Sequence, residues 1–562
     1  MLDLSMVIYI FLILINSLTA QGSIMLVGGG GEGYGSWSDQ PYGWFVEKAD
    51  SGKIITIDVD ETSDWYPSYF IYLGANITSH SMQISSVEDA NSFLTYQELL
   101  SADGIFIEGG DQWDYVSNWK NTYVQTAIEF VYNNGGVIGG NSAGMAILGQ
   151  VVFDAENGSL TSDQAAYNPY HYRLSLTDDF LNILPNVITD SHFNDRGRLG
   201  RLVIMLARRS QDYGQNLLGI GVEYKTAFCI DENMIGQVYG EMVTIVSKTD
   251  SSDIQCIVNE PPRFTNISFN QLLDGSQFNL NAREIVEDGF WLNPYEPEIN
   301  TQVFFNDINL NGSEDSIAQF GELMVTGLTS EVNNWWYGDL ELQNGDGIVP
   351  NTVIIPRIWS DYDYFPNRII GGEYALASSE ENISNFQNKP FITLFLDDDC
   401  LTSISQDGIL TAGNLTYVLD AYSATHIGIN SDNMPGIVNG NLHFLIEGDL
   451  YDLRSNIDMA FNDKEENDLP SIFYLKQNYP NPFNPNTILQ YDLPKESFVN
   501  IIIHDMLGNV VKNLFSANQS PGYKSIQWDA TNNEGDLVSA GVYLYSIEAG
   551  DSRNTKKMIL LK

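Results

Sequence analysis

The sequence predicts an α/β domain with a doubly wound parallel sheet, followed by a β-rich middle region and a carboxyl-terminal β-sandwich. Apolar runs at residues 23–27, 53–58 and 104–108 are separated by segments compatible with helices. This alternation is typical of parallel strands that are joined by helices. In the later parts of the chain, short runs of period two lie between turns rich in Gly, Asn and Pro, which indicates antiparallel strands.

The chain is too long for one core and is strongly acidic. Its 562 residues correspond to three or four units at roughly 150 residues per domain. The formal net charge is −47, but residues 471–562 are balanced, with 8 basic and 8 acidic residues. The acidic excess therefore lies in the rest of the chain. Such a surface repels nucleic acid and anionic membranes, so we expect neither as a partner.

Residues 1–20 have the pattern of a secretory signal peptide. Residues 6–14 form an apolar run, and Ala20 is a small residue at the expected cleavage point. No basic residue precedes the run and Leu18 is large, so a buried first strand or a membrane anchor remains an alternative. The run is shorter than the roughly 20 residues that a spanning helix needs. We expect export, with no transmembrane segment in the mature chain.

Cysteine usage predicts neither a disulfide framework nor a zinc site. The three residues Cys229, Cys256 and Cys400 are odd in number and show no CxxC spacing. One disulfide and a free thiol remain possible.

Residues 140–144 predict a nucleophile at a sharp turn. The segment Gly-Asn-Ser-Ala-Gly follows an apolar strand at 136–138 and precedes a stretch compatible with a helix. Small residues on both sides of Ser142 let its hydroxyl stand clear of the backbone.

A second segment, residues 190–201, supplies a base and positive charge. His192 can take the proton of Ser142, and Arg196, Arg198 and Arg201 follow it. Arginines hold carboxylates in two-point contact. The two segments together predict acyl transfer from a substrate that carries negative charge. The alternative for some of these arginines is a structural ion pair with Asp190 or Asp195.

Glycines gather at the predicted carboxyl ends of the strands. The loop 28–33 follows the first strand, and 109–112 (Gly-Gly-Asp-Gln) follows the strand at 104–108. In open α/β sheets, ligands bind at this edge. Read alone, the loop 28–33 could also be a dinucleotide-binding turn, although no acidic ribose ligand follows in the expected place.

Four ordered motifs resemble those of cyanophycinases and peptidase E-like serine peptidases. They lie at residues 109–112, 139–144, 190–202 and 219–227. The resemblance covers about 22–249 and implies the flavodoxin-like fold related to class I glutamine amidotransferases. It also implies Ser142 as nucleophile, His192 as base, and an oxyanion hole made by the N–H groups of Ala143 and Gly110. The family positions that line the substrate pocket correspond to Gln112, Asp190, Arg196, Arg198 and Arg201. No metal or cofactor is implied.

The chain departs from the family pattern at two positions. Related enzymes often carry an acidic pair before the Thr-Ala at 226–227, whereas this chain has Glu223-Tyr224. Glu223 is therefore the expected third member of the triad, and another orienting group remains an alternative. Cyanophycinases proper have a glutamine just before the histidine, where this chain has Ser191. An amidotransferase is disfavoured because that class needs cysteine at position 142 and glutamate at position 194.

The middle region carries no motif that indicates chemistry. Residues 226–231 and 271–280 are echoed by 393–397 and 444–453, so the region could be a duplicated or inserted part of the peptidase unit; unrelated strands of similar cadence are the alternative. Residues 307–315 offer alternating oxygen ligands and a glycine, as calcium loops do, but Ala318 stands where such a loop carries glutamate. A solvated turn is the preferred interpretation.

The carboxyl-terminal region resembles the sorting domain of the type IX secretion system. Residues 477–485, 541–545 and 556–562 carry this resemblance, which implies export across a bacterial outer membrane by the type IX machinery. The expected domains are a signal peptide at 1–20, the peptidase domain at 21–285, the middle region at 286–461, a linker at 462–470 and the sorting domain at 471–562.

The predicted function is a secreted or cell-surface serine peptidase. It would hydrolyse aspartyl or isoaspartyl peptide bonds in a peptide or an Asp-rich polymer, with cyanophycin-like Asp-Arg polymer as one candidate. The first alternative is a catalytically degenerate homologue that binds peptide or polymer, suggested by Tyr224 and Ser191. The second is that the middle region is the functional part and binds an extracellular polymer.

Overall fold

The computed structural model describes most of residues 21–454 and 473–561. The residues outside the description are 1–20, 61, 288–292, 295–306, 322, 327–340, 345, 347, 359–366, 379–389, 399, 431–433, 455–472, 476–477, 479–482, 484, 486, 496, 507, 534, 536, 551 and 562. The chain divides into two compact units, Met1–Met459 and Ala460–Lys562. The predicted signal peptide and the linker at 462–470 lie outside the described residues.

The first sheet of the larger unit is mixed and contains the predicted parallel strands. Its order is β16-β15-β11-β10-β1-β5-β4-β2-β3, and β1, β5, β4, β2 and β3 are mutually parallel. These strands are β1 (Ser23–Val27), β2 (Ile54–Asp58), β3 (His80–Gln83), β4 (Gly104–Ile107), β5 (Val137–Asn141), β10 (Thr226–Ile230), β11 (Ile235–Gly240), β15 (Gln277–Asn279) and β16 (Glu284–Glu287).

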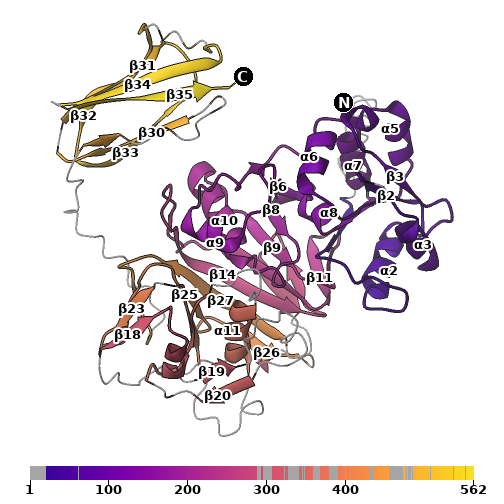
Figure 1. The fold of residues 1–562 in the computed structure, drawn as a ribbon. Coiled ribbons are helices and arrows are strands. Elements are labelled where there is room, and N and C mark those ends of the chain that lie inside the picture. Colours follow the sequence, from indigo (N-terminus) through magenta and orange to yellow (C-terminus); the bar gives the residue numbers. More distant parts are fainter. Residues whose placement is uncertain are drawn as a thin grey trace, which may run out of the picture. The chain divides into compact units, whose positions relative to one another are not determined.

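Helices cover both faces of the parallel strands. Alternate side chains of a strand point to opposite faces, so each face packs into its own core. Met25 and Val27 of β1 join the core of α2 and α3, whereas Ile24 and Leu26 join the core that includes Ile128 of α7. Figure 1 shows these helices around the indigo strands. The helices of this part are α2 (Asp39–Lys48), α3 (Trp65–Tyr72), α4 (Val87–Ala90), α5 (Phe93–Leu99), α6 (Gln112–Trp119), α7 (Tyr123–Asn133) and α8 (Ala143–Ala146).

A second sheet of fifteen strands joins the peptidase-like region to the middle region. Its main path is β20-β19-β21-β22-β25-β27-β14-β12-β9-β8-β6-β7. The first half is β6 (Gly149–Phe153), β7 (Leu176–Thr177), β8 (Leu184–Asp190), β9 (Leu218–Val222), β12 (Met242–Lys248), β13 (Ile254–Gln255) and β14 (Arg263–Leu273). With these strands belong the helices α9 (Ser162–Tyr167) and α10 (Leu199–Tyr213).

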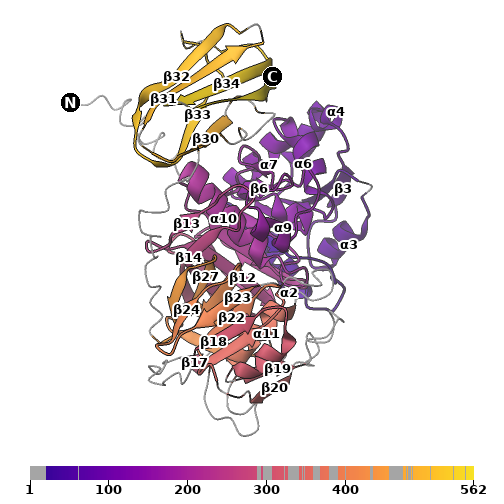
Figure 2. The ribbon, with the colours of Figure 1, turned by 60° about the vertical axis from the view of Figure 1, so that its left-hand side comes forward.

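The middle region supplies the other half of this sheet and a small sheet of its own. It contributes β17 (Asn293–Pro294), β19 (Leu323–Thr326), β20 (Glu341–Asn344), β21 (Thr352–Ile355), β22 (Ile392–Leu396), β25 (Thr416–Asp420), β26 (His426–Ile429), β27 (Pro435–Leu445) and α11 (Asn367–Ala377). The small sheet has the order β18-β23-β24-β28, with β18 (Ile308–Asn311), β23 (Leu401–Ile404), β24 (Ile409–Thr411) and β28 (Leu450–Asp452). Figure 2 shows these orange strands continuing from the magenta ones.

The expectation for residues 307–315 of the middle region can be compared with the structure. Residues 307–315, for which a solvated turn is preferred over a calcium loop, contain a strand at 308–311 and a turn at 312–313, and Asp307 accepts a hydrogen bond from the N–H of Gln406. Of the residues that the structure describes, none form a group of three or more potential metal ligands. The 3-10 helix η1 (Asp315–Phe320) follows instead.

The carboxyl-terminal unit is built of antiparallel strands in two sheets around one core. The orders are β29-β30-β33 and β32-β31-β34-β35, and side chains of both sheets, including Tyr491, Trp528 and Tyr545, share the core. Its strands are β29 (Tyr474–Leu475), β30 (Thr487–Leu493), β31 (Ser497–Asp505), β32 (Val510–Gln519), β33 (Gly522–Trp528), β34 (Gly541–Ala549) and β35 (Ser552–Leu560).

Two chemical expectations can also be compared with the structure. Cys229, Cys256 and Cys400 are all buried and free, so the described structure has no disulfide among them. Within the described parts of the chain, no helix has both the length and the apolar character needed to cross a membrane.

A buried carboxyl group joins the two halves of the large sheet and predicts a pH-dependent stability. Gln271 of β14 donates from Nε2 to Oε2 of Glu373 in α11 over 2.6 Å. Burial raises the pKa of Glu373 to about 8. The folded state therefore binds the proton of Glu373 more tightly than the unfolded state does. The contribution of this proton to the free energy of unfolding is fully present below about pH 4.5 and is lost as the pH rises through 8.

We therefore expect Glu373→Gln to stabilise the larger unit at pH 8 by a few kcal/mol (about 1.4 kcal/mol per pKa unit) relative to the wild-type protein, with little effect at pH 4.5. Denaturant unfolding across this pH range measures the difference. The exposed Glu447 gives the control variant Glu447→Gln. A stability difference between Glu373→Gln and the wild-type protein that does not change with pH would contradict the assignment.

Candidate active site

Ser142 lies on a sharp turn between β5 and α8. Its backbone angles are φ 53° and ψ −113°, a conformation that is strained for a residue with a side chain. The turn is possible because its neighbours are small: a Cβ added to Gly140 would lie 2.4 Å from the carbonyl carbon of Gly144. Ser142 as a residue is half-buried, as expected for a nucleophile at such a turn.

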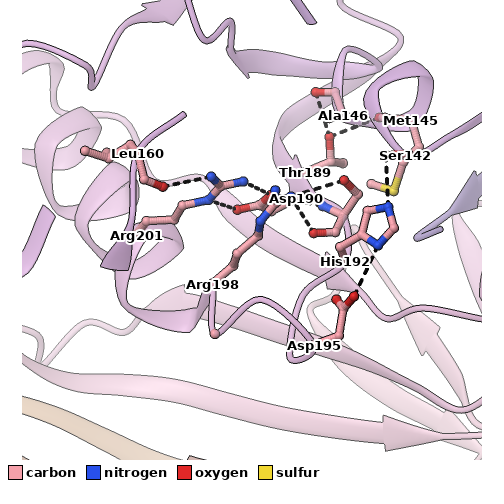
Figure 3. Close-up of polar contacts among 12 residues, drawn as sticks. Ser142, Met145, Ala146, Leu160, Thr189, Asp190, His192, Asp195, Arg198 and Arg201 are labelled. Atoms are coloured by element: carbon pink, nitrogen blue, oxygen red, sulfur yellow. Dashed lines mark hydrogen bonds and ion pairs between the residues drawn. The ribbon is translucent and has the colours of Figure 1, made fainter. Parts of the chain in front are cut away.

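His192 faces the hydroxyl of Ser142 from the end of β8. Its Nε2 lies 3.1 Å from Oγ of Ser142, within the reach of a general base, and Figure 3 shows this contact. The backbone of His192 has φ 44°, and its N–H donates to the carbonyl of Gly28 over 2.8 Å. A Cβ on Gly29 would lie 2.3 Å from Cε1 of His192, so this glycine makes room for the imidazole.

Asp195, and not Glu223, contacts the second nitrogen of His192. Oδ2 of Asp195 lies 3.3 Å from Nδ1 of the ring. This corrects the expectation that Glu223 is the third member of the triad. The residue that occupies the usual acidic position, Tyr224, lies instead with its ring nearly parallel to the imidazole, 6.2 Å away.

Glu223 supports the loop that carries this triad. Its carboxylate accepts hydrogen bonds from the backbone N–H groups of Asn194 (2.5 Å), Asp195 (3.3 Å) and Tyr224 (2.7 Å). The side chain is fully buried. Burial, together with the nearby charge of Asp195, raises the pKa of Glu223 well above its ordinary value. Glu223 therefore holds the backbone of this loop, and Asp195 is the carboxylate that contacts the imidazole.

Two of the three arginines are used within the protein. Arg201 donates from Nε and Nη2 to Asp190 over 2.7 and 2.5 Å, and from Nη1 to the carbonyl of Leu160. Arg198 donates to Asp190 over 3.1 Å and to the carbonyl of Ser191 over 2.7 Å. Burial opposes the charge of Asp190, but the two arginines outweigh it, so its pKa lies below the ordinary value.

These contacts separate the predicted pocket residues into two groups. Asp190, Arg198 and Arg201 are buried, and Figure 3 shows them joined in one cluster to one side of His192. Arg196, on the same loop, is exposed. A substrate carboxylate reaches Arg196 without breaking a buried ion pair, whereas contact with Arg201 would require Asp190 to move.

The expected oxyanion hole has one helix-terminal donor and one glycine. Ala143 begins α8, and amides in the first turn of a helix have no intrahelical acceptor. Of the two glycines after β4, Gly109 is adjacent to the nucleophile, since a Cβ there would lie 3.4 Å from Cβ of Ser142. Gly110, the predicted donor, faces Tyr115, whose hydroxyl would lie 2.8 Å from an added Cβ. Gln112 begins α6 and is half-buried.

Glu32 holds the residue next to the nucleophile and was not predicted. Its Oε1 accepts from Nδ2 of Asn141 over 2.8 Å and from the hydroxyl of Tyr42 over 3.0 Å. Burial raises the pKa of Glu32. The glycine-rich loop before it is explained by packing, because an added Cβ at Gly28 would lie 2.1 Å from the carbonyl oxygen of Glu223. The loop thus supports the serine site, and a nucleotide is not needed to account for its glycines.

Sequence patterns could have suggested some of the missed residues. Asp195 stands three residues after His192, a spacing at which a turn brings side chains together, but nothing in the pattern ranks it above Glu223. Gly29 and Glu32 belong to the loop 28–33, whose pattern predicts a strand-end loop but no role for either residue.

The orienting role of Asp195 predicts a large loss of serine reactivity in Asp195→Asn. We expect the rate of reaction of Ser142 with a fluorophosphonate to fall by roughly 10²- to 10⁴-fold, because the amide no longer stabilises a protonated imidazole and favours the wrong tautomer. The labelling rate measures this, with unchanged thermal stability as a check on folding. Exposed Glu88 gives the control Glu88→Gln. A wild-type labelling rate in Asp195→Asn would exclude this role.

Comparison with known proteins finds two matching segments in this chain. Residues 64–237 match the model of Peptidase family S51, and residues 486–553 match that of the FlgD Ig-like domain. The cyanophycinase of Synechococcus elongatus is 30% identical over 202 residues, which are 35% of this chain and 59% of that protein. The cyanophycinase of Trichormus variabilis is 28% identical over 212 residues, 36% of this chain and 66% of that protein.

Among solved structures, a peptidase from an acI-B1 actinobacterium aligns with 46% of this chain and 98% of its own, at 20% identity and a TM-score of 0.34. The chain spans about three fifths of the length of the first of these cyanophycinases. The match to the family model includes Ser142 and His192 together with the loop of Asp195 and Glu223. Residues 64–237 are therefore similar to the serine-type peptidases of family S51.

Proposed function

We propose that the protein is a secreted serine peptidase that hydrolyses peptide bonds at aspartyl or isoaspartyl residues. The observation that carries the proposal is the contact of 3.1 Å between Ser142 Oγ and His192 Nε2, with Asp195 at the other ring nitrogen. The similarity to cyanophycinases supports an Asp-containing substrate, with Asp-Arg polymer as one candidate.

The arrangement supports a two-step acyl transfer. Ser142 Oγ attacks the scissile carbonyl while His192 Nε2 takes its proton, and the carbonyl oxygen becomes an oxyanion near the N–H groups of Ala143 and Gly109 or Gly110. When the C–N bond breaks, His192 gives the proton to the leaving amine. Water then repeats the sequence on the acyl-serine, with His192 again as base, and releases the carboxylic acid and free Ser142. Asp195 stabilises the imidazolium in both steps.

The charge distribution supports a substrate with both signs of charge. Arg196 is exposed on the loop that follows His192 and is suited to a substrate carboxylate. The acidic excess of the chain, net −47, favours the approach of cationic side chains.

The proposal also includes secretion of the protein and the fold type of each unit. The motifs at 477–485, 541–545 and 556–562 support a sorting domain of the type IX secretion system, folded as a β-sandwich from the two sheets of the smaller unit. The signal pattern at 1–20 supports passage through the periplasm to the cell surface or beyond. The parallel strands with helices on both faces support a doubly wound, flavodoxin-like sheet of the kind found in class I amidotransferases.

The proposal predicts hydrolysis that depends on Ser142. We expect the protein to release products from cyanophycin or from a panel of α- and β-aspartyl peptides, and Ser142→Ala to abolish this release, because Ser142 supplies the attacking oxygen. Chromatography of the products with mass detection measures it. The exposed Ser159 gives the control Ser159→Ala. If the wild-type protein binds these substrates without turnover, the proposal fails and the degenerate binding protein takes its place.

The exposure of Arg196 predicts a change in KM and not in serine reactivity. We expect Arg196→Gln to raise KM for aspartyl substrates about tenfold or more, since a charge-assisted hydrogen bond is lost, while the fluorophosphonate labelling rate stays near the wild-type value. Lys48→Gln, at the carboxyl-terminal end of α2 and paired with Glu232, is the matched loss of one positive charge. Equal KM values for the two variants would exclude this role of Arg196.

A further inference from the structure

The large sheet has an internal symmetry centred on the pair β14 and β27. Moving outward in one direction the strands are β14, β12, β9 and β8, and in the other β27, β25, β22 and β21. In each direction two antiparallel pairings are followed by a parallel one. A helix, α10 or α11, lies between the two parallel strands in the chain.

The strands beyond this core also correspond in order and direction. β19 runs parallel to β21 as β6 does to β8, and β20 is antiparallel to β19 as β7 is to β6. The small sheet β18-β23-β24-β28 repeats the order β1-β10-β11-β15, with antiparallel pairing throughout. Chance similarity of strands would not reproduce two sheets with the same connections.

The correspondence holds residue by residue at the strand ends. The N–H of Gly28 donates to the carbonyl of Thr226 over 3.0 Å, and that of Gly312 donates to Cys400 over 2.8 Å. An added Cβ at Gly28 would lie 2.1 Å from the carbonyl oxygen of Glu223, and one at Gly312 would lie 1.9 Å from that of Asp397. We call β18–β25, β27 and β28 the second set of strands, and their counterparts before them the first set. Asp397 therefore occupies in the second set the place that Glu223 has in the first.

Unusual backbone angles recur at matching positions. Asn266 (φ 51°) corresponds to Asn439 (φ 60°), and Gly275 (φ 83°) corresponds to Gly448 (φ 88°). His192 (φ 44°) corresponds to Arg357 (φ 54°), because each is the second residue beyond the matching end of its strand, β8 or β21. Positive φ is uncommon outside glycine, so these matches are independent support for a repeat.

The two sets meet as the two partners of a two-fold dimer would. Ser268 lies opposite Asn441, its own counterpart, while Ile267 lies opposite Leu442 and Phe269 opposite Gly440. This reciprocal pairing defines an isologous interface. Without β27, the long strand β14 would present an open edge that invites another chain.

Contacts outside the symmetric pattern also bind the second set to the first. Arg263 of β14 holds Asp449 with two hydrogen bonds of 3.0 and 2.7 Å. The hydroxyl of Tyr167 in α9 donates to Asp397. The counterpart of Glu223 thus serves as an acceptor for the catalytic half.

The second set has lost the catalytic pair. Among the described residues of 307–454, no strands correspond to β2–β5, which lead to the nucleophile turn, and the place of His192 is taken by Arg357. We propose that residues 307–454 are a second, degenerate copy of the peptidase fold that covers the β14 edge as a built-in partner, in place of a second molecule. The chain then has the architecture of a two-fold dimer with one active site.

The register at the symmetry axis provides the test. Ser268 and Asn441 are both half-buried and directly paired, and directly paired strand residues have Cα atoms about 4.5–5.5 Å apart, within the range of a disulfide. In the full chain, the double variant Ser268→Cys and Asn441→Cys is oxidised and analysed by non-reducing electrophoresis and peptide mass mapping. The native cysteines are buried. Ser268→Cys with Glu447→Cys is the control, because Glu447 follows Asn441 by six residues and lies in the turn beyond the end of β27.

We expect a cross-link between positions 268 and 441 within one chain, formed by most of the protein, and none in the control. A cross-link that joins two chains would show that the β14 edge takes a second molecule and would overturn the proposal. Absence of any cross-link in a folded double variant would overturn the register and the two-fold pairing. This readout does not depend on turnover, so its failure is distinct from failure of the proposed peptidase activity.

Discussion

The active site depends on one buried carboxylate that makes no contact with the reacting atoms. Glu223 accepts three backbone N–H groups, from Asn194, Asp195 and Tyr224, and so fixes the turn that follows β8. His192 can keep its unusual backbone angle because this turn is held from behind. The distance from the imidazole to Ser142 is therefore set by main-chain hydrogen bonds, and Asp195 is free to hold the ring.

The arginines around the site differ in burial and therefore in role. Arg198 and Arg201 are buried with Asp190, and removing one member of such a cluster would leave an unpaired buried charge. Arg198 and Arg201 therefore stabilise the protein structure next to His192. Arg196, on the surface of the same loop, has no such cost, which makes it the group suited to substrate. A motif with three arginines thus combines a structural pair with one exposed charge.

Part of this account could be predicted from sequence. The turn of Ser142, the position of His192 and the parallel strands before them followed from local patterns, because glycine spacing and apolar runs have direct structural causes. The choice between Glu223 and Asp195 could not be made, since it depends on where the turn after β8 places each carboxylate. The split among the arginines depended in the same way on the tertiary position of Asp190.

The sequence also predicted the internal repeat only in part. The echo between 271–280 and 444–453 corresponds to the equivalent ends of β14 and β27. The echo between 226–231 and 393–397 pairs β10 with β22, whereas the strand order matches β22 to β9. Short apolar runs look alike in sequence, and only strand pairing distinguishes them.

A crystal structure of the protein after reaction with a fluorophosphonate would test the central claim most directly. The account predicts a phosphonyl group on Ser142 Oγ, its oxygen within hydrogen-bonding distance of the N–H groups of Ala143 and Gly109 or Gly110, and His192 still bound to Asp195 through Nδ1. An adduct on another residue, or an imidazole turned away from Asp195, would contradict the assignment of the site.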